Sequence, residues 1–177
     1  MRLNVHEIDE IAKELVYEEA TDSLNGLLVH GQVCDFDFPA AAAVRMQYYR
    51  SGQELFFQGH IEGPVVGHCA RCTEDYAFLL QKDFSLVLVP RQQVPGDTEL
   101  SEDDLDLSFY QGDAVDLSPL IREQIILALP TRPLCQEACK GLCPQCGANL
   151  NTQTCECSAR SGDPRLAVLG DNLKARH

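Results

Sequence analysis

The stretch that decides the fold runs from residue 44 to residue 61 and reads VRMQYYRSGQELFFQGHI. On either side of Ser51-Gly52, apolar residues fall at every second position, which is typical of two half-buried strands joined by a turn. We therefore expect a β-hairpin here. Downstream, the apolar runs at 76–80 and 84–90 predict one long or broken strand that ends at Pro90, because proline cannot donate a ladder hydrogen bond.

One helix is predicted after these strands. Ser118 followed by Pro119 is a good helix start, since a hydroxyl can cap the first turn and proline suits the first helical position. Pro130 ends this helix, and its apolar residues spread around much of its surface, so we expect it to pack across the sheet. Residues 2–15 fit either a strand or a short helix, and Asp163-Pro164 predicts a second helix start.

The chain has nine cysteines, and most of them crowd together near its C-terminal end. Within this region, Cys143-Pro144-Gln145-Cys146-Gly147 is a zinc knuckle: two thiolates followed by a glycine that can take a positive φ and turn its amide toward a sulfur. Cys155-Glu156-Cys157 supplies two more thiolates. Four sulfurs make a closed structural zinc site, which leaves no open position for a water or a substrate.

The remaining cysteines allow a second zinc site. The simplest partition gives one zinc to Cys143, Cys146, Cys155 and Cys157, and another to Cys69, Cys72, Cys135 and Cys139. The second zinc would join the sheet to the chain after the predicted helix. Cys135 and Cys139 lie at i and i+4, so a helix there would place both sulfurs on one face. One zinc with the other thiols free is the alternative, and a different fourth ligand beside the Cys155 and Cys157 pair stays open. Cys34 stands alone and is expected to be a small buried residue.

A disulfide framework is the competing interpretation of these cysteines. Their odd number argues against it, and acidic residues follow the N-terminus where a signal peptide needs an apolar run. No stretch approaches the length of a transmembrane helix. We therefore expect a cytoplasmic protein without a membrane segment, and in a reducing cytoplasm C-x-x-C pairs are more often metal ligands or redox centres than disulfides.

Two enzymatic interpretations also start from the cysteines. Residues 139–146 carry the C-x-x-x-C-x-x-C spacing of iron–sulfur enzymes that use S-adenosylmethionine, but the chain after them is too short for the barrel such enzymes need. The pair at Cys69 and Cys72 has a cationic neighbour, Arg71, that could lower a thiol pKa, yet a thioredoxin-like βαβ context is absent. His68 could replace a cysteine at a metal. We favour structural zinc over both enzymatic interpretations.

The charge of the chain constrains its partners. The net charge is −13, whereas a protein that grips phosphates normally shows a basic face. Between Gly96 and Asp116 acidic residues accumulate without lysine or arginine, so this segment is expected to run over the surface as a solvated loop, or to serve as a docking strip. A basic partner is thus easier to accommodate than bare nucleic acid.

Several motifs, in one order, resemble the bacterial YceD family. They are CARC at 69–72, Asp116-Leu117 leading into EQIILALP at 123–130, CKGLCPQCGANLN at 139–151 and DPR at 163–165. The resemblance is close over about the C-terminal two-thirds of the chain. It implies a large ribosomal RNA subunit accumulation protein, needed for normal levels or processing of 23S rRNA in bacteria and plastids.

These observations predict an α+β protein with an antiparallel β-sheet, a packed helix from about Pro119 to Leu129 and a C-terminal zinc-knuckle segment. We expect a sheet-plus-helix core domain at 1–133 and a cysteine-rich zinc-binding segment at 134–177, with one or two zinc ions per chain.

The expected function is a non-enzymatic ribosome biogenesis factor that supports 23S rRNA processing or accumulation and large-subunit assembly. Its partner would be a large-subunit ribosomal protein or a pre-50S assembly intermediate, with possible 23S rRNA contacts at Arg71, Lys140 and Arg165. The alternatives are a nucleic-acid-binding zinc module and a thiol redox or iron–sulfur protein.

Overall fold

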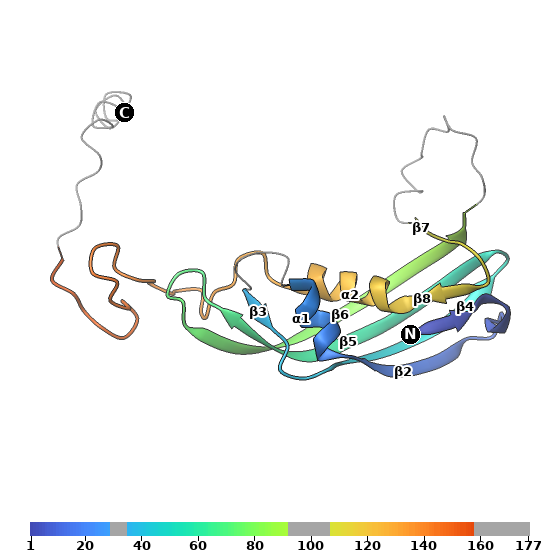
Figure 1. Cartoon of the computed structure of the whole chain (residues 1–177), viewed down its shortest axis with the longest axis horizontal. Helices are drawn as coiled ribbons and strands as arrows, with labels where there is room; N and C mark the ends of the chain where they lie inside the picture. Colours follow the sequence, from blue (N-terminus) through green and yellow to red (C-terminus); the bar gives the residue numbers. More distant parts are fainter. Residues whose placement is uncertain (29–34, 92–106, 158–177) are drawn as a thin grey trace, which may run out of the picture.

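The computed structural model describes residues 1–28, 35–91 and 107–157, and it is α+β as predicted (Figure 1). Its helices are α1 (Thr21–Leu28) and α2 (Leu117–Ala128), and a 3-10 turn, η1, covers Val5–Glu7. Its strands are β1 (Arg2–Asn4), β2 (Lys13–Glu19), β3 (Phe36–Asp37), β4 (Ala42–Ser51), β5 (Glu54–His68), β6 (Asp75–Pro90), β7 (Leu107–Tyr110) and β8 (Ala114–Asp116).

The predicted hairpin is formed by β4 and β5. Its register runs from Ser51 opposite Glu54 to Ala43 opposite Glu62, and Gly52 in the turn has a φ of 61°. The apolar runs after it form the single strand β6, which lies antiparallel to β5 along nearly its whole length. The order of the main sheet in the described residues is β2-β4-β5-β6-β7, and β3 pairs with the far end of β5.

The sheet is not wholly antiparallel, which corrects one detail of the prediction. β7 pairs with β6 in the parallel direction, with Val87 opposite Leu107 and Pro90 opposite Tyr110. A parallel neighbour needs a long crossover connection, and residues 91–106 separate the two strands in the sequence. The alternation of residues within β6 carries no signal for the direction of the strand beside it.

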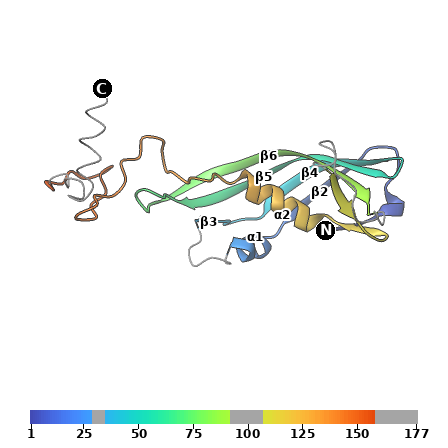
Figure 2. The same ribbon diagram turned by 90° about the horizontal axis from the view of Figure 1, so that it is seen from above.

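The helix α2 lies on one face of the sheet (Figures 1 and 2). It packs there through a single stripe of side chains. Leu117, Ile121 and Ile125 recur at i, i+4 and i+8 and are completely buried. Ile126 and Leu127, by contrast, are 42% and 67% exposed. Although apolar residues lie around much of the helix, as predicted, only the side chains that face the sheet are buried in the core. Apolar side chains that face away from the sheet, such as these two, stay exposed.

The start of α2 also differs from the prediction. The N-cap is Asp116, whose carboxylate accepts a hydrogen bond of 3.2 Å from the Ser118 amide. Pro119 lies within the first turn, where helix amides have no partner in the helix and the missing N–H costs nothing. The helix ends at Ala128, followed by Leu129 and Pro130, so the predicted position is correct to within about a turn.

The N-terminal region, left open between strand and helix, contains β1, η1 and β2, and the short helix α1 was not predicted. β1 pairs with β8 in a separate two-stranded sheet next to α2. The Glu19 carboxylate at the end of β2 is buried and lies 2.9 Å from Nε of Arg122 in α2. These contacts hold α2 over the sheet and leave the opposite face of the sheet uncovered in the described residues (Figure 2).

Several sequence-based predictions fall outside the described residues. Cys34, most of the acidic segment and the region from residue 158 onward are among them, and the last of these includes the predicted helix start at Asp163-Pro164 and Arg165. The described part of the acidic segment contains β7 and β8. Neither α1 nor α2 has the length and apolar character that a membrane-spanning helix requires.

Candidate metal centres

Within the described residues, two groups of four cysteines come together in space, and the sulfur atoms within each group lie within 4.8 Å of one another. We call them the buried cluster and the exposed cluster. The buried cluster contains Cys69, Cys72, Cys135 and Cys139, and the exposed cluster contains Cys143, Cys146, Cys155 and Cys157. The structure thus groups the eight thiols as in the simplest partition, and either cluster can hold a metal ion.

The sulfur spacing in the buried cluster fits a tetrahedral metal site. Cys69 Sγ lies 3.8 Å from Cys139 Sγ, and Cys72 Sγ lies 3.6 Å from Cys135 Sγ. Tetrahedral zinc with Zn–S bonds of about 2.3 Å places its ligand sulfurs about 3.8 Å apart. All eight thiols are free, so the clusters are not disulfides.

The buried cluster forms where the β5–β6 hairpin meets the chain after α2. The last pair of the hairpin is His68 opposite Asp75, and Cys69 and Cys72 lie in the turn beyond it. The Ala70 amide donates to the Pro133 carbonyl at 2.8 Å, which brings the later chain against this turn. The spacing of Cys135 and Cys139 suggested a helix, but these residues do not lie on one. A turn joins them instead, closed by a 3.0 Å bond from the Cys139 amide to the Gln136 carbonyl.

The two C-x-x-C pairs have the same backbone structure. The residue after the second cysteine donates its amide to the carbonyl of the first: Thr73 to Cys69 and Gly147 to Cys143, each at 2.9 Å. The amide of the first cysteine then donates to the carbonyl five positions later, at 3.0 Å in the buried cluster and 2.8 Å in the exposed cluster. The pair at Cys69 and Cys72 is therefore a second knuckle, although it lacks the glycine that marks the first.

The glycine and its counterpart both have left-handed backbone conformations. Gly147 has a φ of 75° and Thr73 has a φ of 60°. A β-branched residue is rare in this region because its Cβ crowds the backbone, so Thr73 is strained where Gly147 is not. Metal coordination by Cys69 and Cys72 would offset that strain.

Gly147→Ala is expected to weaken metal binding at the exposed cluster. A Cβ at this position meets no atom within 4 Å, so the whole effect comes from the positive φ. A cost of about 1 kcal/mol corresponds to a fall in affinity of roughly fivefold. Competition with a zinc chelator measures this change. The matched control is Gly26→Ala in α1, which also meets no atom within 4 Å but has no positive φ, and it should leave metal affinity unchanged.

Backbone amides favour the thiolate form of the first cysteine in each knuckle. Amides of Cys146 and Gln145 lower the pKa of Cys143 to about 6. Burial works against the Cys69 thiolate, but amides of Cys135, Arg71 and Cys72 still lower its pKa to about 6. Such donors make these two sulfurs the natural anchors of a metal ion.

One thiol in each cluster resists ionisation without a cation. Burial and the sulfur of Cys72 raise the pKa of Cys135 to about 12, and the sulfur of Cys146 does the same for Cys157. Neighbouring thiolates repel one another, so four cannot form together unless a metal cation compensates their charge. A bound metal cation would stabilise the thiolate form of all four sulfurs in each cluster.

Arg71 supports the buried cluster from within. Its Nη1 donates to the Cys139 carbonyl at 2.6 Å, and its own carbonyl accepts from the Leu142 amide at 3.0 Å. The side chain is half-buried. Lys140, the second predicted contact residue, is exposed, with its amide bonded to the Asn151 side chain at 2.8 Å. Arg165 lies outside the described residues.

Arg71→Gln is expected to destabilise the region around the buried cluster by about 1.5 kcal/mol, because it removes a charge-assisted hydrogen bond to a carbonyl. All four thiols remain, so metal content should not change. Urea unfolding and metal analysis check the two statements. Arg132→Gln is the control, since Arg132 is an exposed cation nearby. Unchanged stability with weakened RNA binding would show that Arg71 contacts a partner instead.

His68 does not join the buried cluster, although it precedes Cys69. Its Nδ1 lies 2.6 Å from Oδ1 of Asp75, and its Nε2 lies 3.3 Å from Oδ2 of Asp37. Hydrogen bonds to these carboxylates, first of all to Asp75, raise the pKa of His68. Both ring nitrogens are thus engaged, and the sulfur grouping around Cys69 does not include this residue.

Sequence reasoning missed Asn149 and Asn151. The Asn151 amide group donates to Cys139 Sγ at 3.3 Å, and Asn149 donates at 3.3 Å to Oε1 of Glu74, which follows the Cys69–Cys72 knuckle. Their signal in the sequence was their place two and four positions after a C-x-x-C-G knuckle, since asparagine side chains readily bond to nearby backbone and thiolate groups.

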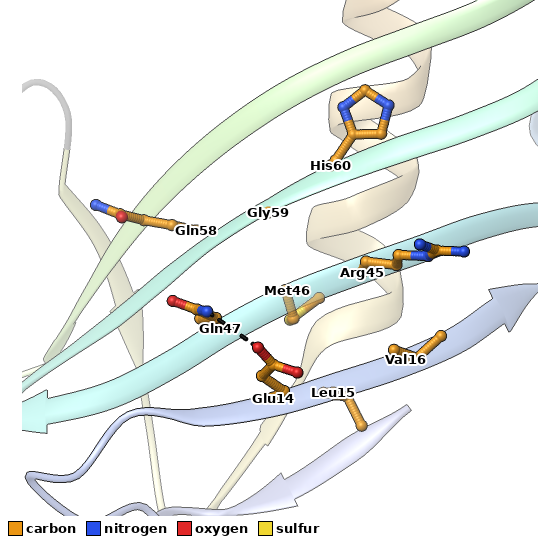
Figure 3. Close-up of a pocket in the computed structure, with 9 residues that line it drawn as sticks. All are labelled: Glu14, Leu15, Val16, Arg45, Met46, Gln47, Gln58, Gly59 and His60. Carbon is orange, nitrogen blue, oxygen red and sulfur yellow. Dashed lines mark hydrogen bonds between the residues drawn. The ribbon is translucent and has the colours of Figure 1, made fainter.

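A hollow of about 600 Å³ lies on the main sheet, away from the cysteines (Figure 3). It is formed by β2, β4 and β5, and Oε1 of Glu14 accepts a 3.2 Å bond from Gln47 at its edge. His60 at the rim lies 2.7 Å from Asp83. The lining residues include no serine, threonine or cysteine, so the hollow offers no nucleophile for a histidine to activate. It is lined by Glu14, Leu15, Val16, Arg45, Met46, Gln47, Gln58, Gly59 and His60.

Comparison with known proteins decides the family. The family described as large ribosomal RNA subunit accumulation protein YceD matches residues 57–174, a range that includes every cysteine of both clusters. The chain belongs to the YceD family. The resemblance found in the sequence motifs is thereby confirmed.

Relatives of this YceD family member occur in plants and bacteria. It is 28% identical over 178 residues to the large ribosomal RNA subunit accumulation protein YCED homolog 1, chloroplastic, of Arabidopsis thaliana, covering 84% of this chain and 54% of the relative. The Zea mays protein of the same name is 30% identical, covering 67% of this chain and 49% of the relative. The chain thus spans about half the length of these plant relatives. The uncharacterized protein YlbN of Bacillus subtilis is 24% identical and covers 98% of this chain and 97% of its own length. No solved structure matches.

Proposed function

We propose that this YceD family member is a non-enzymatic ribosome biogenesis factor that supports 23S rRNA processing or accumulation and large-subunit assembly. The observation that carries the proposal is the family match over residues 57–174, together with plant relatives named for accumulation of large-subunit ribosomal RNA. The cysteine clusters fit a supporting role, because a site closed by four sulfurs leaves no position for a substrate.

We propose zinc as the metal at both clusters. Thiolates are soft ligands that bind zinc, copper(I) and iron–sulfur clusters, and a tetrahedral group of four sulfurs fits zinc well. When bound, zinc would cross-link the turn after β5 to the chain after α2 and supply no reactive water. Metal analysis of purified protein should give two zinc ions per chain, and folded protein without metal whose eight thiols all react with a thiol reagent would contradict this.

The competing cysteine chemistries find little support in the geometry. The spacing typical of S-adenosylmethionine enzymes is divided between the clusters, since Cys139 lies in one while Cys143 and Cys146 lie in the other. Cys69 and Cys72 are each 2% exposed, so a dithiol there would be closed to a protein substrate. An absorption spectrum of anaerobically purified protein separates the cases: iron–sulfur protein is coloured, and the zinc protein is not.

We propose that the partner is a basic large-subunit ribosomal protein, either free or exposed on a pre-50S assembly intermediate. We propose that they meet in the cytoplasm. The support is the net charge of −13, which disfavours binding through phosphates alone. A nucleic-acid-binding zinc module is the second candidate, and the exposed Lys140 between the two clusters favours it. The proposed contact through Arg71 loses support, because its guanidinium already bonds within the protein.

Depletion of the protein from cells tests the proposal. We expect mature 23S rRNA to fall or large-subunit precursors to accumulate, and the protein to co-sediment with those precursors and not with finished ribosomes. Normal 23S rRNA levels and a normal sedimentation profile after depletion would contradict the proposal. Re-expression of the wild-type chain is the control, since it must restore the profile.

A further inference from the structure

The two clusters are joined by a loop that belongs to one and contacts the other. Residues 147–154 connect Cys146 to Cys155, so they lie between the two ligand pairs of the exposed cluster. In the middle of this loop, Nδ2 of Asn151 donates to Sγ of Cys139, a member of the buried cluster, at 3.3 Å. Oδ1 of the same side chain accepts from the Lys140 amide at 2.8 Å.

Further bonds fix this loop against two neighbouring segments. One is residues 141–142, between the two clusters, and the other is Glu74, which follows the Cys69–Cys72 knuckle. The Leu150 amide donates to the Gly141 carbonyl at 2.9 Å, and Leu142 pairs with Asn149 across a β-bridge. The Asn149 side chain accepts from the Asn151 amide at 3.0 Å and donates to Glu74 at 3.3 Å. Gly141 is buried with a φ of 76°, and a Cβ there would lie 3.0 Å from the Arg71 carbonyl, so the contact between the segments is close.

We propose that metal binding at the exposed cluster raises the metal affinity of the buried cluster, and that Asn151 is the positioning residue that carries this coupling. The inference rests on the zinc sites of the proposed function and adds that they are not independent. Neither sulfur group contains Asn151, so its role is to orient a ligand and not to bind the metal itself.

The physical reason is the closure of a loop. A metal ion that joins Cys143 and Cys146 to Cys155 and Cys157 closes residues 147–154 into a short ring, which removes most of their conformational freedom. The ordered loop then holds the Asn151 N–H on the Cys139 sulfur at little further entropic cost. A hydrogen bond to a ligand sulfur favours the thiolate, and removal of such supporting groups typically lowers metal affinity about 10–100-fold. By linkage, metal at the buried cluster strengthens binding at the exposed cluster by the same factor.

Alkylation in zinc buffers, read by peptide mass spectrometry, tests the coupling because it reports each cysteine separately. In wild-type protein, bound zinc should protect Cys69 and Cys72 from alkylation. The free zinc concentration at which half of the protein is protected is the midpoint. In the Cys155→Ser/Cys157→Ser double variant, which removes two ligands of the exposed cluster only, the protection midpoint of Cys69 and Cys72 should rise at least about tenfold.

Asn151→Asp tests the coupling residue. Aspartate keeps an acceptor for the Lys140 amide but loses the Nδ2 donor, which bonds to Sγ of Cys139 and also to Oδ1 of Asn149 at 2.9 Å. In the wild-type background it should raise the midpoint of Cys69 and Cys72 by a similar factor. In the double-serine background its further effect should be less than about threefold, because the loop is already open there. Gln153→Ala, an exposed residue of the same loop, is the control and should shift nothing.

The outcomes separate this inference from the zinc proposal. Protection of all eight thiols in wild-type protein, with the same Cys69 and Cys72 midpoint in the double-serine variant, would overturn the coupling and leave the zinc sites intact. Absence of protection in wild-type protein at every zinc concentration would overturn both. Should circular dichroism show that the double-serine variant is unfolded, Asn151→Asp alone decides, since an unchanged midpoint in that variant overturns the inference.

Discussion

Cys139→Ser is expected to release the metal from the buried cluster and to lower the free energy of unfolding by more than about 4 kcal/mol, the range that accompanies loss of a structural metal. The Cys139 side chain is 2% exposed and its sulfur lies 3.8 Å from that of Cys69. Its loss breaks the link between the β5–β6 turn and the chain after α2. It also leaves the sulfurs of Cys69, Cys72 and Cys135 without a metal cation, so their thiolates must take up protons.

Urea unfolding at fixed free zinc, followed by circular dichroism, measures this effect. Cys146→Ser is the matched control, because it removes a ligand from the exposed cluster without opening the core. That variant should make residues 142–157 sensitive to protease, while the unfolding transition of the sheet and α2 loses only about 1.4 kcal/mol, the cost of tenfold weaker metal binding at the buried cluster. Equal loss of stability in the two variants would show that both clusters support the sheet alike, against the expectation from their burial.

The sequence was most informative where a pattern repeats. Alternation identified β4 and β5, since each of these strands buries one face against the core, and two apolar runs identified β6. The knuckle at Cys143 and Cys146 was visible because its spacing and its glycine are both local features. A prediction from such local features needs no knowledge of distant contacts.

Features that depend on distant contacts were missed or were wrong in detail. The parallel pairing of β7 is set by the path of the chain and not by the residues of the strand. The second knuckle was obscured because Thr73 takes the left-handed conformation that glycine takes in the first. The position of Asn151 after the knuckle did not reveal its partner, since Cys139 is brought near by the fold of the loop.

Binding to a basic large-subunit ribosomal protein is expected to weaken at least about tenfold between 0.1 M and 0.5 M salt, because the attraction of opposite charges is screened as the Debye length shortens. The uncovered face of the sheet offers exposed carboxylates for such a partner. These carboxylates belong to Glu14 and Glu18 on β2, Glu62 on β5 and Asp83 on β6. Arg45 on β4 is an exposed cation between these strands, so the carboxylates outnumber it. Naked 23S rRNA should bind weakly near physiological salt, since the net charge of −13 repels phosphates.

Charge-reversal variants separate the two kinds of partner. Glu18→Lys with Glu62→Lys should weaken binding to the basic protein and reduce its salt dependence, because two attractive charges become repulsive. Lys140→Glu is the counterpart for RNA, as Lys140 is exposed between the clusters. Affinities for the ribosomal protein and for 23S rRNA, measured across the same salt series, give the answer. Tight binding to rRNA alone, abolished when Lys140 and the cations from Arg160 onward are reversed, would reject the protein partner and establish direct RNA recognition.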